Sequence, residues 1–231
     1  MNALYVLLLI GTIQVSGVTM QQEAASEYSC TIPSYPLEMK DPGEVFEGIE
    51  RRLLSERMVL RFHVTSSGAF AADLQGELEL QDDNVLSLKA AGTFGEQDVE
   101  LRLDSDGTSM TGGNGVQNFD EETPAALRES VALGLTRMGI LHNLARLTAG
   151  SVPDHAAEGV GDWLVASEIR TGDSTASSPE HIVFDILVTG IKTASAELEV
   201  DASNGLPSRR LQTVRFPGGE MNVVEEYSWG T

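Results

Sequence analysis

The chain has 231 residues, of which 35 are acidic and 15 are basic, and its formal net charge is −20 at pH 7. This balance argues against nucleic acid as a partner, because each phosphate contact requires a lysine or an arginine. It also predicts repulsion from anionic lipid surfaces, so any contact with lipid is expected inside a pocket rather than on a bilayer. Solubility alone is the simpler interpretation of the same charge.

The amino-terminal segment is predicted to be an export signal. Residues 4–13 form an apolar run, and the stretch after it ends in residues suited to cleavage at 15–17. We expect residues 1–17 to be a signal peptide and the protein to be periplasmic. An uncleaved amino-terminal anchor is the alternative, since no lysine or arginine precedes the apolar run. Residues 18–40 carry no periodicity and are expected to form an extended leader.

The single cysteine, Cys30, is predicted to carry neither a lipid nor an internal disulfide. It follows Glu27, Tyr28 and Ser29, whereas a lipoprotein processing site resembles a leucine and two small residues before the cysteine. One cysteine cannot form a disulfide within the chain, so a hydrophobic core has to hold the fold. Residues 41–231 are long enough to bury such a core, and their even patterning predicts one domain.

A first helix is predicted directly after Asp41. Asp41 suits the N-cap and Pro42 suits the first helical position. The apolar residues that follow at helical spacing are Val45, Phe46, Ile49 and Leu53. A helix of three to four turns with one apolar face is therefore expected here.

After this helix the apolar period changes from about 3.6 residues to 2, which indicates strands with one side in solvent. Polar turn clusters at 81–84 and 106–107 separate the first strands, so consecutive strands are expected to pair as an antiparallel meander. Eight or nine strands are expected, enough for the sheet to curl. They are centred on residues 60–65, 74–80, 99–104, 163–169, 182–188, 194–200, 211–216 and 221–229.

A second helix is predicted between the two groups of strands. Thr123 and Pro124 suit its start, and Gly150 with Pro153 beyond suits its end. Its apolar residues cover well over a third of its circumference, so it is expected to lie against a concave apolar surface. The polar residues left for solvent are Arg128, Glu129, Arg137, Asn143 and Arg146. The sequence thus predicts an α+β fold, a curved antiparallel sheet or unclosed β-barrel whose concave face is covered or filled by helices.

No catalytic or metal centre is predicted, and we expect neither an enzyme nor a cofactor. The histidines have no spacing typical of metal ligation or nucleophile activation, and each is interpreted as a surface residue. They are His63, His142, His155 and His181. Residues 104–107 lack the ligands of a calcium loop and are interpreted as a turn. The glycine-rich residues 112–115 are interpreted as a flexible connection, with a mobile flap as the alternative.

Residues 201–207 read Asp-Ala-Ser-Asn-Gly-Leu-Pro, a hairpin connection in which Asn204 and Gly205 can adopt positive φ. With this turn, and with the order helix, meander, helix, meander over roughly residues 43–229, the chain resembles the bacterial outer-membrane lipoprotein carrier and sorting family. The resemblance implies an unclosed barrel with helices as a lid, acyl chains in its hollow and no catalytic centre. Related sensor domains and surface-attached glycolipid carriers share this architecture.

Two functions are compatible with these expectations. One is a monomeric periplasmic carrier or chaperone that holds lipid or an acylated lipoprotein in a hydrophobic cavity. The other is an envelope sensor or interaction module that binds a protein through a sheet edge or the acidic outer face. Each expected cavity residue is also interpretable as ordinary core. These residues are Leu60, Phe62, Leu74, Leu78, Leu101, Leu127, Val131, Leu135, Met138, Leu141, Phe184, Ile186 and Leu198.

Overall fold

The structure is a computed structural model, and it describes residues 42–150, 164–171, 180–188 and 191–230. The expected signal peptide, the expected leader, Cys30 and His155 lie outside the described residues.

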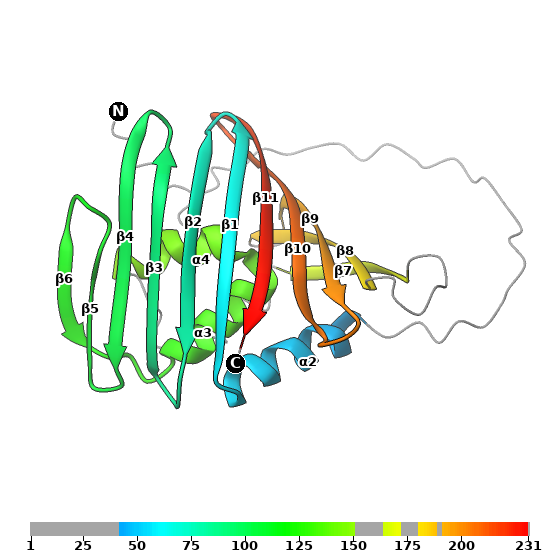
Figure 1. The fold of residues 1–231 in the computed structure, drawn as a ribbon. Coiled ribbons are helices and arrows are strands. Elements are labelled where there is room, and N and C mark those ends of the chain that lie inside the picture. Colours follow the sequence, from blue (N-terminus) through cyan, green and yellow to red (C-terminus); the bar gives the residue numbers. More distant parts are fainter. Residues whose placement is uncertain (1–41, 151–163, 172–179, 189–190, 231) are drawn as a thin grey trace, which may run out of the picture.

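Within the described residues, eleven strands form one antiparallel sheet, in the order β6-β5-β4-β3-β2-β1-β11-β10-β9-β8-β7 (Figure 1). Consecutive strands pair within β1 to β6 and within β7 to β11, and pairing of β1 with β11 joins these two meanders. Strands β6 and β7 are the two edges, so the sheet is not closed into a barrel. The bounds are β1 Met58–Gly68, β2 Ala72–Leu80, β3 Val85–Phe94, β4 Gln97–Asp106, β5 Ser109–Gly113, β6 Asn118–Glu122, β7 Leu164–Thr171, β8 Glu180–Val188, β9 Ile191–Asp201, β10 Leu206–Phe216 and β11 Gly219–Gly230.

The strands follow the period-2 pattern of the sequence. In β1, Leu60 and Phe62 are buried, whereas Arg61 between them is exposed. The expected hairpin is also present, because Gly205 has a φ of +66° in the turn that joins β9 to β10. One face of the sheet is thus apolar and the other is polar, as the expected α+β architecture requires.

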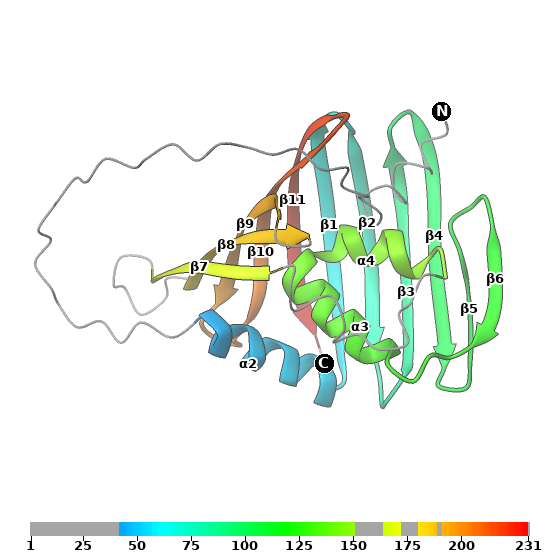
Figure 2. The same ribbon diagram turned by 180° about the vertical axis from the view of Figure 1, so that it is seen from behind.

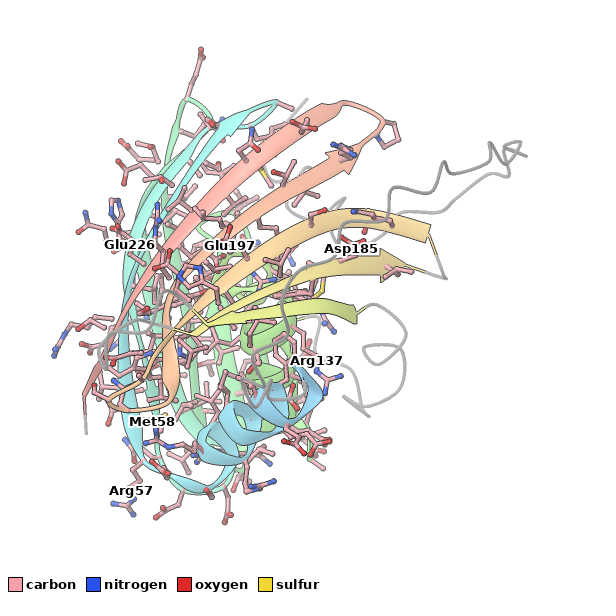
Figure 3. All side chains as sticks on the ribbon, turned by 90° about the vertical axis from the view of Figure 1, so that its right-hand side faces the viewer. Arg57, Met58, Arg137, Asp185, Glu197 and Glu226 are labelled. Atoms are coloured by element: carbon pink, nitrogen blue, oxygen red, sulfur yellow. The ribbon has the colours of Figure 1, made fainter. Side chains whose placement is uncertain are left out.

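The helices lie on the concave side of the sheet (Figures 2 and 3). They are α2 Pro42–Ser55, α3 Leu127–Leu133, the π-helix η1 Gly134–Met138 and α4 Ile140–Leu147. Helices α3 and α4 lie across the strands of the first meander, and α2 lies beneath the second (Figure 2). None of these helices has the length and apolarity needed to cross a membrane.

The central helix differs from the prediction of one continuous helix that begins at Thr123. The Oγ1 atom of Thr123 lies 2.9 Å from the Oγ atom of Ser105, so this side chain does not cap the helix. Instead, the Oδ1 atom of Asn84 accepts a hydrogen bond of 3.0 Å from the backbone N–H of Arg128. The helical run is then broken at Gly139, where φ is +92°.

The predicted number of eight or nine strands was also too low, since β3, β5 and β6 were not recognised. Gly112 and Gly113 belong to β5 instead of forming a flexible connection. Packing against β6 explains why glycine stands at position 112. A Cβ atom at Gly112 would lie 2.5 Å from the Phe119 ring of β6, so glycine is what allows this ring to cross over β5.

Candidate functional site

The residues predicted to line a cavity lie together on the concave side. Twelve of the thirteen are buried in one continuous apolar cluster, and Met138 packs against it partly buried. The cluster joins the inner face of the sheet to residues 127–147, which comprise α3, η1 and α4 and are called the helical cover below. In this structure the side chains of the helical cover pack into the hollow of the sheet. Binding of a ligand by these residues stays a prediction.

Arg210 on β10 holds the end of η1. Its side chain is fully buried, and its Nη1 and Nη2 atoms donate hydrogen bonds of 3.1 and 2.7 Å to the carbonyl oxygens of Thr136 and Arg137. Its Nε atom donates to Gln212 at 2.9 Å, and the guanidinium lies 5.1 Å from the centroid of the Phe184 ring. The last carbonyls of a helix lack partners within it and carry partial negative charge, so a cation is favourable there.

Glu225 on β11 holds the start of α4. Its carboxylate is buried and accepts hydrogen bonds from the backbone N–H groups of Ile140 at 3.0 Å and Leu141 at 2.9 Å. The hydroxyl of Tyr227 donates to the same carboxylate. Burial, with the nearby charge of Glu225, raises the pKa of Tyr227 well above its usual value, so the hydroxyl keeps its proton at neutral pH. An anion at the N-terminus of a helix satisfies free N–H groups and the positive end of the dipole.

Gly139 allows this carboxylate to reach the helix. A Cβ atom at Gly139 would lie 2.5 Å from the Oε2 atom of Glu225, and the backbone has a φ of +92° and a ψ of 168°. This conformation is essentially restricted to glycine. The break between η1 and α4 therefore depends on Gly139 in the cover and on a carboxylate from the sheet.

Arg210 and Glu225 are direct partners in the ladder between β10 and β11. We call them the clamp. One strand thus supplies a cation for the carbonyl end of η1, and its neighbour supplies an anion for the N–H end of α4. The clamp fixes both sides of the break in the helical cover to one place on the sheet.

The other end of the cover is held by Arg128, which is 5% exposed. Its guanidinium donates to the carbonyl oxygens of Leu53 at 2.9 Å and Glu56 at 2.5 Å, and also to that of Gln81 in the turn after β2. One side chain thus ties the end of α2, the start of α3 and a turn of the sheet together. The prediction that Arg128 faces solvent was wrong.

An ion pair joins α2 to η1. The Nε atom of Arg137 lies 2.6 Å from the Oε1 atom of Glu50, and Figure 3 shows Arg137 beside α2. The Glu50 side chain is 9% exposed. The ion pair therefore provides a third polar link that holds the cover in place, shielded from much of the solvent.

Two further predictions for the cover were wrong, because His142 and Asn143 are buried rather than exposed. The Nδ2 atom of Asn143 donates a 3.0 Å hydrogen bond to the carbonyl of Val131, and Gly134 leaves room for this amide. Burial, together with the nearby charges of Arg146 and Arg210, lowers the pKa of His142 to about 3, so the ring is neutral near pH 7. The break at Gly139 changes the helical phase, and α4 therefore presents other residues to the sheet than a continuous helix would.

Charged residues elsewhere form pairs on the outer face. His63 lies 2.8 Å from Asp73, and His181 lies 3.0 Å from Glu197. Among the described residues, no group of histidine, cysteine, aspartate or glutamate side chains is arranged to hold a metal ion. A groove of about 550 Å³ crosses β2 to β5 on the convex face, and its charged lining of Glu77, Lys89, Glu100 and Arg102 is balanced in sign.

No family model and no curated protein sequence matches the chain. Similar solved structures include LprF from Mycobacterium bovis, with a TM-score of 0.42, 12% identity, and coverage of 84% of this chain and 95% of that chain. The MucA/MucB complex of Pseudomonas aeruginosa gives a TM-score of 0.40 and 14% identity, and the match covers 81% of this chain and 56% of that chain. The LolA superfamily protein NE2245 from Nitrosomonas europaea gives a TM-score of 0.39 and 8% identity, and the match covers 80% of this chain and 90% of that chain. A member of the lipoprotein carrier family that the sequence resembles is thus among these structures.

Proposed function

We propose that the protein binds the acyl chain of a lipid or of an acylated lipoprotein, without catalysis, between the helical cover and the concave face of the sheet. The observation that carries this proposal is the continuous apolar cluster between a curved, unclosed sheet and a cover made of short pieces. Export to the periplasm and a monomeric state belong to the same proposal.

The cover is suited to displacement because its helices are short. Helix α3 has 7 residues and α4 has 8, whereas isolated helices shorter than about 12–15 residues are marginal in water. Their stability therefore comes from packing against the sheet. A ligand that offers the sheet an equivalent apolar surface can replace this packing.

The magnitudes of the two interactions are comparable. An acyl chain of about 15 methylene groups gains roughly 12 kcal/mol on complete burial, at about 0.8 kcal/mol for each group. Exposing five buried leucine or isoleucine side chains costs a similar amount, at about 1.5–3 kcal/mol each. The buried side chains of this kind in the cover are Leu127, Leu133, Leu135, Ile140, Leu141, Leu144 and Leu147. In apolar burial alone, exchange of part of the cover for one acyl chain is thus close to balanced.

Native mass spectrometry of the protein purified from a Gram-negative periplasm, followed by organic extraction, tests the proposal. We expect discrete adducts of lipid mass on the unmodified protein. Met138→Glu places a charge at a partly buried position beside the cluster and should remove these adducts. Leu54→Glu is the matched control, since Leu54 is 41% exposed on α2, and should retain them. A clean mass without adducts, and no uptake of added phospholipid or acylated peptide, would contradict the proposal.

The second candidate, a protein-interaction module, draws on the unpaired edges of the sheet. Strand β6 is an edge and could accept a strand from a partner. It carries Asp120, Glu121 and Glu122, however, and charged residues are typical of edges that are protected against pairing. This observation favours the acyl-binding proposal. Binding of an extended peptide without lipid uptake would favour the interaction module.

A further inference from the structure

The clamp residues carry opposite charges on directly opposed positions of β10 and β11, and both are buried. In the structure each of them makes two hydrogen bonds to the helical cover. Arg210 binds the carbonyl oxygens of Thr136 and Arg137, and Glu225 binds two N–H groups at the start of α4. The closed arrangement therefore uses each charge for a different helix end.

Displacement of the cover would remove all four of these hydrogen bonds at once. A charge left without a partner in an apolar hollow is strongly unfavourable. The hydrogen bonds of Arg210 to Gln212 and of Glu225 to Tyr227 would remain, because these partners are on the sheet itself. They do not neutralise either charge, so the open hollow needs another source of compensation.

The ladder supplies that compensation. Directly opposed residues of an antiparallel pair have Cβ atoms about 4.5–5.5 Å apart, which lets a long cation and a carboxylate on one face meet. We propose that Arg210 and Glu225 exchange partners, binding the two helix ends when the hollow is closed and each other when it is open. This inference rests on the proposed function, since an acyl ligand is what displaces the cover. The exchange would allow opening without an unpaired buried charge.

Partner exchange predicts that the effects of the two substitutions on the free energy of opening are not additive, and it predicts the sign of the difference. Each single neutral variant, Arg210→Gln or Glu225→Gln, removes the charged contacts of one residue to the closed cover and also leaves the other charge unpaired in the open form. The double variant leaves no charge behind. It should therefore open more readily than the two single variants together predict. If the two residues attracted each other only in the closed form, the double variant would open less readily than the two single variants predict. If they anchored the cover independently, the effects of the two single variants would simply add.

Amide hydrogen exchange of Ile140 and Leu141 measures this opening in the ligand-free protein, since exchange of these amides requires release from Glu225. We expect exchange in the double variant to be at least tenfold faster than the product of the two single effects. A rate equal to or below that product would overturn the inference. The acyl-binding proposal is tested separately, by titration of the unmodified protein with a fluorescent fatty acid of 16 carbons. No binding of the probe would overturn that proposal, whereas the exchange cycle still decides on the clamp.

The charge-swap variant Arg210→Glu/Glu225→Arg is a second, independent test. It keeps an opposed pair of charges for the open form, but it places an anion at the carbonyl end of η1 and a cation at the N–H end of α4. We expect a folded sheet, judged by the retained strand signal in circular dichroism, with loss of protection at Ile140 and Leu141. Full protection of these amides would contradict the exchange. So would global unfolding of the swap variant at a denaturant concentration that the double neutral variant survives.

Discussion

The ring of Phe62 lies over Gly76, its direct partner on β2. A Cβ atom at Gly76 would lie 2.4 Å from the Cζ atom of Phe62 and 2.2 Å from the carbonyl oxygen of Lys89. The missing side chain in β2 therefore provides the space for an aromatic ring at the centre of the concave face. Aromatic rings packed over a glycine in a neighbouring strand are a known means of fixing strand register.

Gly76→Ala should destabilise the fold, because the added methyl group meets both the ring and a backbone oxygen. Overpacking of this kind typically costs about 1–3 kcal/mol of unfolding free energy. Urea unfolding measures the loss. Adding Phe62→Leu to the Gly76→Ala protein should recover part of it, since leucine does not reach the methyl group. An unchanged midpoint for Gly76→Ala would show that the ring does not pack at this position.

Gly139→Ala should destabilise the protein by about 2–4 kcal/mol, because alanine is strained in this conformation and its methyl group displaces the carboxylate of Glu225. The matched control is Gly48→Ala in α2, where a Cβ atom meets nothing within 4 Å. That variant should gain roughly 0.5–1 kcal/mol, since alanine favours a helix interior. Thermal and urea unfolding report both values. Equal effects of the two substitutions would contradict the assigned role of Gly139.

The alternating strands, the hairpin at residues 201–207 and the concave apolar face could be predicted because their signals are local. The short β5 and β6 could not, since glycine, asparagine and aspartate carry no alternation there. The break at Gly139 was missed because a single glycine is tolerated in a helical pattern, and its cause is a carboxylate on a distant strand. Assuming one continuous phase then assigned His142 and Asn143, which follow the break, to solvent. Arg128 precedes the break and was assigned to solvent because of its charge, since its carbonyl partners on α2 and after β2 are distant in the sequence.

One signal for the clamp was present in the sequence but was not used. Glu225 falls between Val223 and Tyr227 at the inward positions of an alternating run, whereas its neighbour Glu226 faces outward (Figure 3). A carboxylate on the inner face of a strand requires a partner. Which partner it has could not be predicted, because the N–H groups of Ile140 and Leu141 become available only when the helix breaks.

Arg128→Met should cost roughly 3 kcal/mol or more of unfolding free energy, because it removes a buried cation from three carbonyl oxygens and leaves them without this donor. Methionine keeps most of the length and the apolar packing of the stem. Arg57→Met is the control, since the side chains of Arg57 and its ion-pair partner Asp82 are 70% and 66% exposed. It should change the urea midpoint little. If the two variants unfold alike, Arg128 does not join α2, α3 and the sheet.

His142 should make the stability depend on pH between about 6.5 and 5. Its pKa is lowered to about 3 in the folded protein, first by burial and then by Arg146 and Arg210, whereas the unfolded chain has the ordinary value near 6.5. Between these values only the unfolded chain binds the proton. The contribution of His142 is therefore complete above pH 6.5 and is lost as the pH falls, by up to about 1.4 kcal/mol for each pH unit.

Urea unfolding at pH 6.5 and pH 5 measures this dependence. From pH 6.5 to pH 5, we expect the unmodified protein to lose roughly 2 kcal/mol more unfolding free energy than His142→Gln loses. Because paired carboxylates lose their contribution mainly below pH 5, they add little within this interval. If His142→Gln and the unmodified protein lose the same stability between pH 6.5 and 5, the ring of His142 takes up its proton in the folded state, and the neutral buried imidazole inferred for α4 is wrong.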